Sequence, residues 1–124
     1  MCKILISIKP EYVNEILSGR KKYEYRKVKA KKDNVDKMII YATAPIMKVV
    51  AEIEILKILE DSPDLIWENT KEYSGINKSF YDKYYENRNI AIAYQLGKVE
   101  KYNKPKELSD LGISYSPQSF IYID

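Results

Sequence analysis

The feature that most constrains the fold is a pair of long stretches in which apolar and polar residues alternate until the alternation changes phase. In residues 47–59 the apolar side chains first occupy odd positions and move to even positions from Leu56. Residues 89–102 behave in the same way, with the phase change at Gly97. Alternation with a period of two predicts strands, and a phase slip predicts a bulge or coil of the kind that a barrel needs.

Shorter patterns predict the other elements. Runs of β-branched and apolar residues are typical of buried strands, and proline or asparagine before an apolar stripe is typical of a helix start. The predicted strands are residues 3–9, 21–28, 38–44, 47–59, 89–102 and 118–124. The predicted helices lie over residues 10–18, between Ser62 and Gly75, and from Asn77 onward. This order leaves little room for parallel crossovers, so we expect an α+β fold: a small, mostly antiparallel barrel with three short peripheral helices.

Length and composition limit the possible chemistry. With 124 residues, 45% of them hydrophobic and 31% charged, the chain is predicted to form one soluble domain over residues 1–124. A single cysteine, Cys2, excludes an internal disulfide, and the absence of histidine excludes Ser-His-Asp and Cys-His catalysis. We expect no metal or other cofactor, since most zinc sites need histidine or several cysteines. The N-terminal apolar run is too short for a signal peptide or a membrane span, which predicts a cytoplasmic protein.

Positive charge is concentrated in one segment of the chain. Residues 19–32 contain eight basic side chains, two tyrosines and a single acid, Glu24. Residues 1–57 carry 13 basic and 7 acidic side chains, whereas residues 58–124 carry 8 and 11. A surface polarised in this way suits a polyanionic partner, and ordinary solvated surface lysines are the alternative.

The predicted strand over residues 21–28 carries part of this charge on one face. Strand alternation would place Lys22, Glu24 and Arg26 side by side, opposite two tyrosines. If that face lines a cleft, Glu24 can orient Arg26 while the lysines bind an anion. If it faces bulk water, the segment is a plain amphipathic edge strand.

A second ambiguity concerns the aromatic residues of the helix that begins after Asn77. They have helical spacing, and they are Phe80, Tyr81, Tyr84 and Tyr85. Such a cluster suits a packed core or lid, and it also suits a platform on which bases stack.

Several short motifs occur together in one order along the chain. They are ISIKPEYVNEILSGRKKYEYRK, MIIYATAPIMKVVAEIEI and, near the C-terminus, SYSPQSFIYI. In this combination the sequence from about Ile4 to Ile123 closely resembles the ASCH domain, a relative of the PUA, EVE and YTH domains. The resemblance implies a PUA-like β-barrel, in agreement with the strand pattern.

The resemblance also implies a function. ASCH domains are proposed to bind RNA or nucleotides in a cleft beside the barrel, so RNA or a modified nucleotide is the expected partner. The implied nucleic-acid-binding residues are Ser7, Lys9, Lys21, Lys22, Glu24, Arg26, Lys27, Thr43, Gln118 and Ser119. Lysine and arginine would contact phosphates, and Gln118 or Glu24 could pair with a base edge. Gln118 and Ser119 could equally serve only to fix the last strand by hydrogen bonds.

An enzyme is the alternative to a binding module. Some small family members resemble amidohydrolases that act on acetylated cytidine through a lysine, a threonine three residues later and a distant glutamate, and ribonuclease activity has been suggested for others. Lys21 matches that lysine, but Glu24 stands in place of the threonine. The opposite charge of Glu24 is expected to hold Lys21 protonated, which is unfavourable for a base. A third hypothesis is a regulatory module whose basic face binds an acidic protein.

Overall fold

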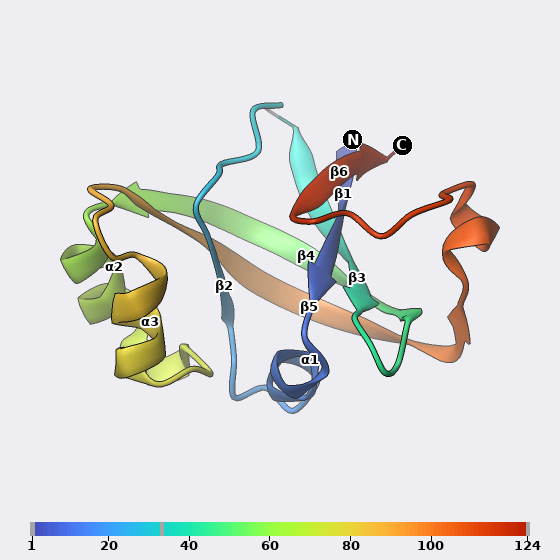
Figure 1. Ribbon diagram of the computed structural model, residues 1–124, viewed down its shortest axis with the longest axis horizontal. Helices are drawn as coiled ribbons and strands as arrows, with labels where there is room; N and C mark the ends of the chain where they lie inside the picture. Colours follow the sequence, from blue (N-terminus) through green and yellow to red (C-terminus); the bar gives the residue numbers. More distant parts are fainter. Residues whose placement is uncertain (1, 33, 124) are drawn as a thin grey trace.

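The computed structural model describes residues 2–32 and 34–123, which form one curved six-stranded sheet with helices around it (Figure 1). The strands are β1 (Cys2–Ile8), β2 (Tyr23–Arg26), β3 (Val35–Ala42), β4 (Lys48–Asp61), β5 (Ala91–Lys106) and β6 (Phe120–Ile123). The helices are α1 (Pro10–Leu17), α2 (Pro63–Thr70) and α3 (Lys78–Tyr84), with 3-10 turns at Lys71–Tyr73 and Leu108–Leu111. The order of strands and α-helices expected from the sequence is confirmed.

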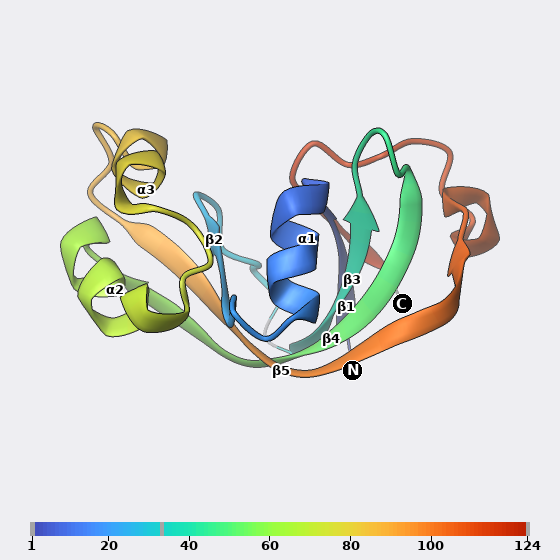
Figure 2. The same cartoon turned by 90° about the horizontal axis from the view of Figure 1, so that it is seen from below.

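The strands follow the order β2-β5-β4-β3-β1-β6 across the sheet. Their pairings are antiparallel except between β1 and β3, which run parallel because α1 and β2 intervene in the chain. Figure 2 shows the sheet curving around α1 as a half-barrel, with α2 and α3 beyond one end of the curve. The predicted α+β, mostly antiparallel PUA-like fold with three short helices is therefore confirmed, except that α1 lies inside the curve of the half-barrel and not at its periphery.

The two long strands bend where their alternation changes phase. The register between β4 and β5 shifts on both sides of Ile55, next to the predicted slip at Leu56. On β5 the phase change falls at Gly97, where a Cβ atom would overlap the carboxylate of Glu54. A residue without a side chain lets the two strands approach closely at this bend.

The core has separate parts on the two sides of β5. The larger part lies between the sheet and α1, where Val13 and Ile16 pack on residues of β1, β3 and β4. A smaller cluster joins the end of the sheet to α2 and α3, and it contains Tyr25, Tyr81 and Tyr85. Of the four aromatic residues with helical spacing, Tyr81 in α3 and Tyr85 just after it are therefore core residues. The other two, Phe80 and Tyr84, line a cavity described below.

Element boundaries differ from the predictions where the chain leaves the sheet. β2 contains only residues 23–26: at its start the N–H of Lys22 donates to the carbonyl of Tyr73 at 2.8 Å, outside the sheet. β3 begins three residues earlier than expected. The last strand begins at Phe120, and the predicted end of that strand at Asp124 lies outside the described residues. Within residues 2–32 and 34–123, no helix has both the length and the apolar character needed to span a membrane.

Candidate functional site

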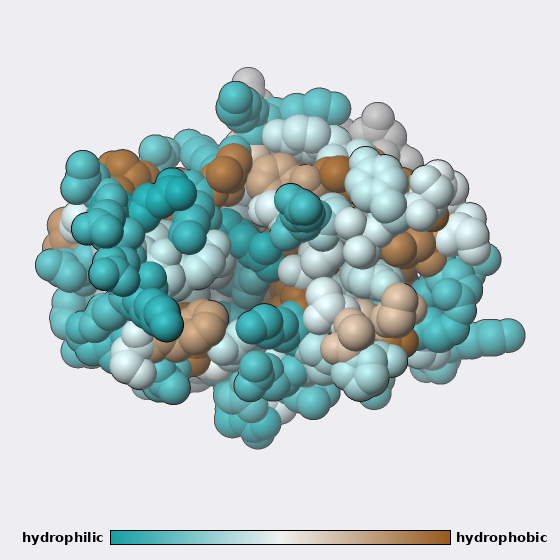
Figure 3. Space-filling model, in the orientation of Figure 1, coloured by the Kyte–Doolittle hydropathy of each residue, from teal (hydrophilic) through white to brown (hydrophobic). Residues whose placement is uncertain are grey.

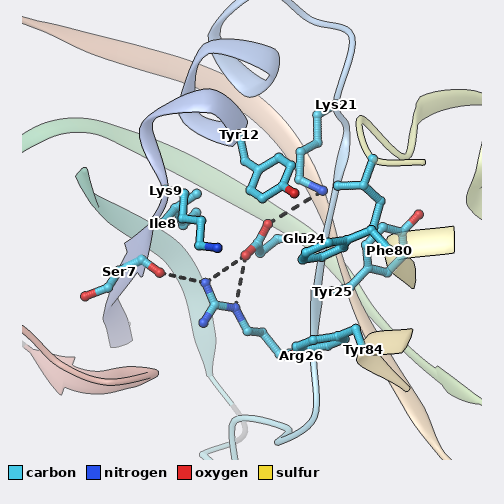
Figure 4. A pocket seen from close by; sticks show the side chains of 11 residues that line it. Ser7, Ile8, Lys9, Tyr12, Lys21, Glu24, Tyr25, Arg26, Phe80 and Tyr84 are labelled. Carbon is cyan, nitrogen blue, oxygen red and sulfur yellow. Dashed lines mark hydrogen bonds and ion pairs between the residues drawn. The ribbon is translucent and has the colours of Figure 1, made fainter. Parts of the chain in front are cut away.

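A cavity of about 180 Å³ opens between β1, α1, β2 and α3, in the hollow near the middle of the face in Figure 3. Figure 4 shows side chains from these elements pointing into it. The lining residues are Ser7, Ile8, Lys9, Tyr12, Lys21, Glu24, Tyr25, Arg26, Ile76, Phe80 and Tyr84. Charged groups lie beside aromatic rings, so one small cavity can contact both an anion and a flat ring.

A buried ionic network forms the charged part of the cavity. Glu24 Oε2 accepts hydrogen bonds from Arg26 Nε at 3.0 Å and from Arg26 Nη2 at 2.8 Å. Arg26 Nη2 also donates to the carbonyl of Ser7 at 2.8 Å, which ties β2 to β1. Glu24 Oε1 lies 3.7 Å from Lys21 Nζ, and Lys9 extends toward the same carboxylate from the other side (Figure 4). Lys21 and Arg26 therefore both pair with this one acid.

Lys21 is the most deeply buried cation of this network, with a side chain 2% exposed. Its Nζ donates to the carbonyl of Ser74 at 2.8 Å and lies 4.8 Å from the centre of the Tyr25 ring. Burial lowers the pKa of Lys21, and the neighbouring Glu24 opposes this shift only in part. Glu24 acts in the expected direction, but the net shift of the Lys21 pKa is downward, because removal of the ammonium from water outweighs the attraction of the carboxylate.

Gly75 shapes the space through which the Lys21 side chain passes. It has a φ of +67°, and a Cβ atom there would lie 2.6 Å from Lys21 Cγ. Only glycine meets both requirements without displacing the lysine. The sequence pattern predicts Gly75 only as a helix end and gives no sign of its contact with Lys21, 54 positions away.

The aromatic wall of the cavity comes from α1 and α3. The rings of Phe80 and Tyr84 are nearly parallel, with an interplanar angle of 9° and centres 6.4 Å apart, and the ring of Tyr12 lies 5.7 Å from that of Phe80. Phe80 is 39% exposed. Burial, more than the nearby acids, raises the pKa of Tyr12 and of Tyr84, so both hydroxyls stay neutral near pH 7. Sequence analysis missed Tyr12 as a lining residue, although it lies within the first quoted motif.

The cavity brings together half of the predicted site residues, namely Ser7, Lys9, Lys21, Glu24 and Arg26. Lys22 does not join them: its side chain is directed to the ring of Tyr73, 4.4 Å away. The prediction that Lys22 shares a charged face with Glu24 and Arg26 is therefore wrong. The physical reason is that Lys21 and Lys22 precede β2, so strand alternation does not apply to them.

The remaining predicted residues contact the edge of the cavity without lining it. Lys27 Nζ lies 4.7 Å from the centre of the Tyr84 ring. The N–H of Thr43 donates to the carbonyl of Ile8 at 3.0 Å. The carbonyl of Ser119 accepts a hydrogen bond from the N–H of Ser7 at 3.3 Å. Gln118 is exposed beside this contact, and both residues precede β6 instead of belonging to it.

The curved sheet, with a charged and aromatic cavity between β1 and α3, defines an α+β half-barrel of the PUA-like class. Within that class, the sequence profile of the ASCH domain matches residues 6–104. The chain therefore belongs to the ASCH domain family. The resemblance inferred from the sequence motifs is confirmed.

The chain is also similar to several individual proteins. ATP synthase subunit alpha from Ureaplasma parvum serovar 3 is 32% identical over 121 residues, which is 97% of this chain and 15% of that protein. An ASCH domain-containing ribonuclease from Zymomonas mobilis is 26% identical over 92 residues, covering 74% of this chain and 62% of the ribonuclease. The chain thus spans less than two thirds of the length of either relative. The crystal structure of ASCH from Zymomonas mobilis has the same fold, with a TM-score of 0.89, 24% identity and coverage of 98% and 87% of the two chains.

Proposed function

We propose that the chain binds RNA, or a modified nucleotide, by accepting one base and a neighbouring phosphate in this cavity. The observation that carries the proposal is the buried network of Lys21, Glu24 and Arg26 beside an aromatic wall. Charged groups held by hydrogen bonds and packing are preorganised, so a ligand need not order them on binding. The relative named as a ribonuclease supports RNA as the class of ligand.

The size and chemistry of the cavity match one nucleotide better than a larger molecule. Pockets for drug-sized ligands measure about 300–1,000 Å³, so a cavity of about 180 Å³ suits a single flat ring. Phe80 and Tyr84 offer faces on which a base can stack. The carboxylate of Glu24 can accept hydrogen bonds from the amino group of a base, and exposed Lys9 can contact a phosphate.

A direct test measures binding of a labelled single-stranded RNA of about eight nucleotides by fluorescence anisotropy, a length within the site sizes seen for single-strand binders. Phe80→Ala should weaken binding by about 1–3 kcal/mol, the usual value for a lost base-stacking ring. Tyr115→Ala is the matched control, because Tyr115 is 61% exposed and does not line the cavity. Lys9→Ala should lower the slope of log affinity against log salt by about 0.7. Tight binding that neither Phe80→Ala nor Lys9→Ala affects would refute the proposal.

Hydrolysis of a nucleotide or of RNA is the second candidate function. The observation in its favour is the buried Lys21, whose lowered pKa makes a neutral amine more accessible as a base or nucleophile, with Glu24 beside it. The name of the Zymomonas mobilis relative supports the ribonuclease form of this proposal. The amidohydrolase form is weaker, since Glu24 occupies the position of the threonine that such enzymes use.

Two substrates separate these candidates: acetylated cytidine and a mixed pool of RNA. An enzyme should convert one of them, and Lys21→Met and Glu24→Gln, which keep the size of each side chain, should abolish turnover without abolishing folding. Circular dichroism of both variants checks the fold. If neither substrate is converted, hydrolysis of these substrates is refuted; if turnover is indifferent to both changes, Lys21 and Glu24 are not its catalytic residues.

A further inference from the structure

We infer that the loop after β2, residues 27–32, is a second anion-binding subsite, and that the ligand is a polynucleotide strand extending from the cavity across this loop. This inference rests on the proposed function and specifies in addition that the ligand is longer than one nucleotide. Three observations carry it: the charge of the loop, the way in which its backbone is held, and its continuity with the cavity.

The loop presents positive charge to solvent at a fixed place. Lys27, Lys29, Lys31 and Lys32 are exposed, and the segment contains no acid. These lysines surround a hollow of about 620 Å³, which Val28, Ala30 and Ile58 complete. The ion pair between Lys29 and Glu60, at 3.1 Å, is about half exposed at both partners and is easily replaced by a stronger anion. A phosphate that binds these lysines therefore does not have to displace a buried acidic partner.

Two tyrosines hold the backbone of this loop. The Tyr94 hydroxyl accepts a hydrogen bond from the N–H of Ala30 at 2.9 Å and donates to the carbonyl of Val28 at 3.2 Å. The Tyr122 hydroxyl accepts a hydrogen bond from the N–H of Lys31 at 2.7 Å. Because these rings are rooted in β5 and β6, the loop is fixed at two points between distant strands. Less conformational entropy is then lost when the lysines bind a ligand.

The hollow and the cavity share a wall. Tyr84 lines the cavity, and the Nζ of Lys27, which lines the hollow, lies 4.7 Å from the centre of the Tyr84 ring. Arg26 and Lys27 are neighbours in sequence, one in each site. The loop rises from the end of β2 toward the top of the molecule in Figure 1, and hydrophilic residues cover that end in Figure 3. A strand with one base in the cavity would therefore bring its next phosphates to the loop.

The test compares short and long ligands on two triple variants. Calorimetry measures the affinity of single-stranded octaribonucleotides of each base and of the corresponding mononucleotides. The loop variant is Lys29→Ala/Lys31→Ala/Lys32→Ala. The control variant, Lys98→Ala/Lys101→Ala/Lys104→Ala, removes three exposed lysines from the distant half of β5. Circular dichroism and the unfolding midpoint establish that both variants are folded.

We expect the loop variant to bind octanucleotides at least about tenfold more weakly and to lose about 2 from the salt slope, since each single-strand phosphate contact contributes about 0.7. Mononucleotide affinity should stay within about twofold, because the cavity is intact. The control variant should change neither affinity by more than about twofold, because its lysines lie far from both sites.

Three results would overturn the inference while leaving the proposed function in place. The wild type could bind octanucleotides no more tightly than mononucleotides, or the loop variant could be indistinguishable from the control variant. In the third result, an octaglutamate peptide would displace the octanucleotide with equal affinity. The last result would indicate an acidic protein as the partner of the loop. If wild type binds none of the nucleotides, the proposed function itself fails, and the two failures are thus distinguishable.

Discussion

The two halves of the basic segment, residues 19–26 and residues 27–32, carry four cations each and place their functional cations in different environments. In the first half Lys21 and Arg26 are buried around Glu24, with distances fixed by hydrogen bonds. In the second half the lysines are exposed on a loop whose backbone is held by tyrosine hydroxyls. A high density of cations therefore does not define one kind of site. Burial decides whether a cation is part of a shaped pocket or a salt-sensitive contact.

The difference follows from what covers each half. The segment around Ser74 and Gly75 packs over Lys21 and supplies the carbonyl that binds its Nζ. The loop leaves the sheet after Arg26, and the hydroxyls of Tyr94 and Tyr122 hold its backbone without covering its lysines. We expect the first half to govern stability and the geometry of binding, and the second to govern the strength of attraction at low salt.

The largest effect should come from removing the acid that neutralises the buried half. Glu24→Ala leaves the cations of Lys21 and Arg26 without a buried partner, and breaking a buried ion pair in this way costs about 3–5 kcal/mol of unfolding free energy. Glu24→Gln, whose amide oxygen can still accept the hydrogen bonds from Arg26, should lose less. Urea denaturation measures both. A loss below about 1 kcal/mol for Glu24→Ala would match an exposed ion pair and would erase the distinction between the halves.

The next effect concerns the covering segment. Gly75→Ala adds a methyl group that overlaps the Lys21 side chain, and overpacking of this kind costs about 1–3 kcal/mol beyond the backbone strain. Gly112→Ala is the matched control, because Gly112 has a φ of +74° with open space around it and so reports the strain alone. Gly75→Ala should also weaken binding of a mononucleotide, since Lys21 must move. Equal losses of stability in the two variants would mean that Gly75 does not shape the site.

A smaller effect should come from changing Tyr122, whose hydroxyl holds the backbone of the loop. Tyr122→Phe removes the hydroxyl that accepts a hydrogen bond from the N–H of Lys31, and the net cost of such a bond is about 1 kcal/mol. Amide hydrogen exchange at Lys31 should become faster, and octanucleotide affinity should fall less than in the triple loop variant. Tyr115→Phe, at an exposed ring, serves as the control. Unchanged exchange at Lys31 would show that the hydroxyl does not hold the loop.

The smallest effect is a difference in pH dependence. Because burial lowers the pKa of Lys21 in the folded protein, the unfolded chain binds more protons between the folded and unfolded pKa values. The unfolding free energy of wild type should therefore rise with pH in that range, and Lys21→Met should lack this contribution. Urea denaturation from about pH 7 to 9.5 tests this, below the usual tyrosine pKa of about 10. Identical slopes would contradict a lowered pKa.

The upper limit of that pH range is set by the buried tyrosines. Burial raises the pKa of Tyr25 to about 12, so its contribution to stability is present below the unfolded pKa and is lost as pH rises through the folded one. This change has the opposite sign to that of Lys21. Measurements above about pH 10 would therefore mix the two effects.

Local patterns predicted most of the fold and part of the site. The phase slips at Leu56 and Gly97 located the bends of the long strands, and the quoted motifs identified the family. Ser7, Lys9, Lys21, Glu24 and Arg26, transferred by position, line one cavity. Lys22 could not be assigned correctly, since its orientation depends on a contact with Tyr73, about fifty residues away in sequence.

The sequence by itself determined which residue types alternate, where the strands bend and how densely the cations follow one another, because these properties depend on near neighbours in the chain. Only the tertiary structure decided which cations are buried, since burial depends on the distant segment that packs over them. Ser74 and Gly75 cover Lys21, whereas the lysines of the loop are exposed to solvent. Removal from water changes the free energy of a charge far more than sequence context does, and this separates a pocket from a surface in one basic segment.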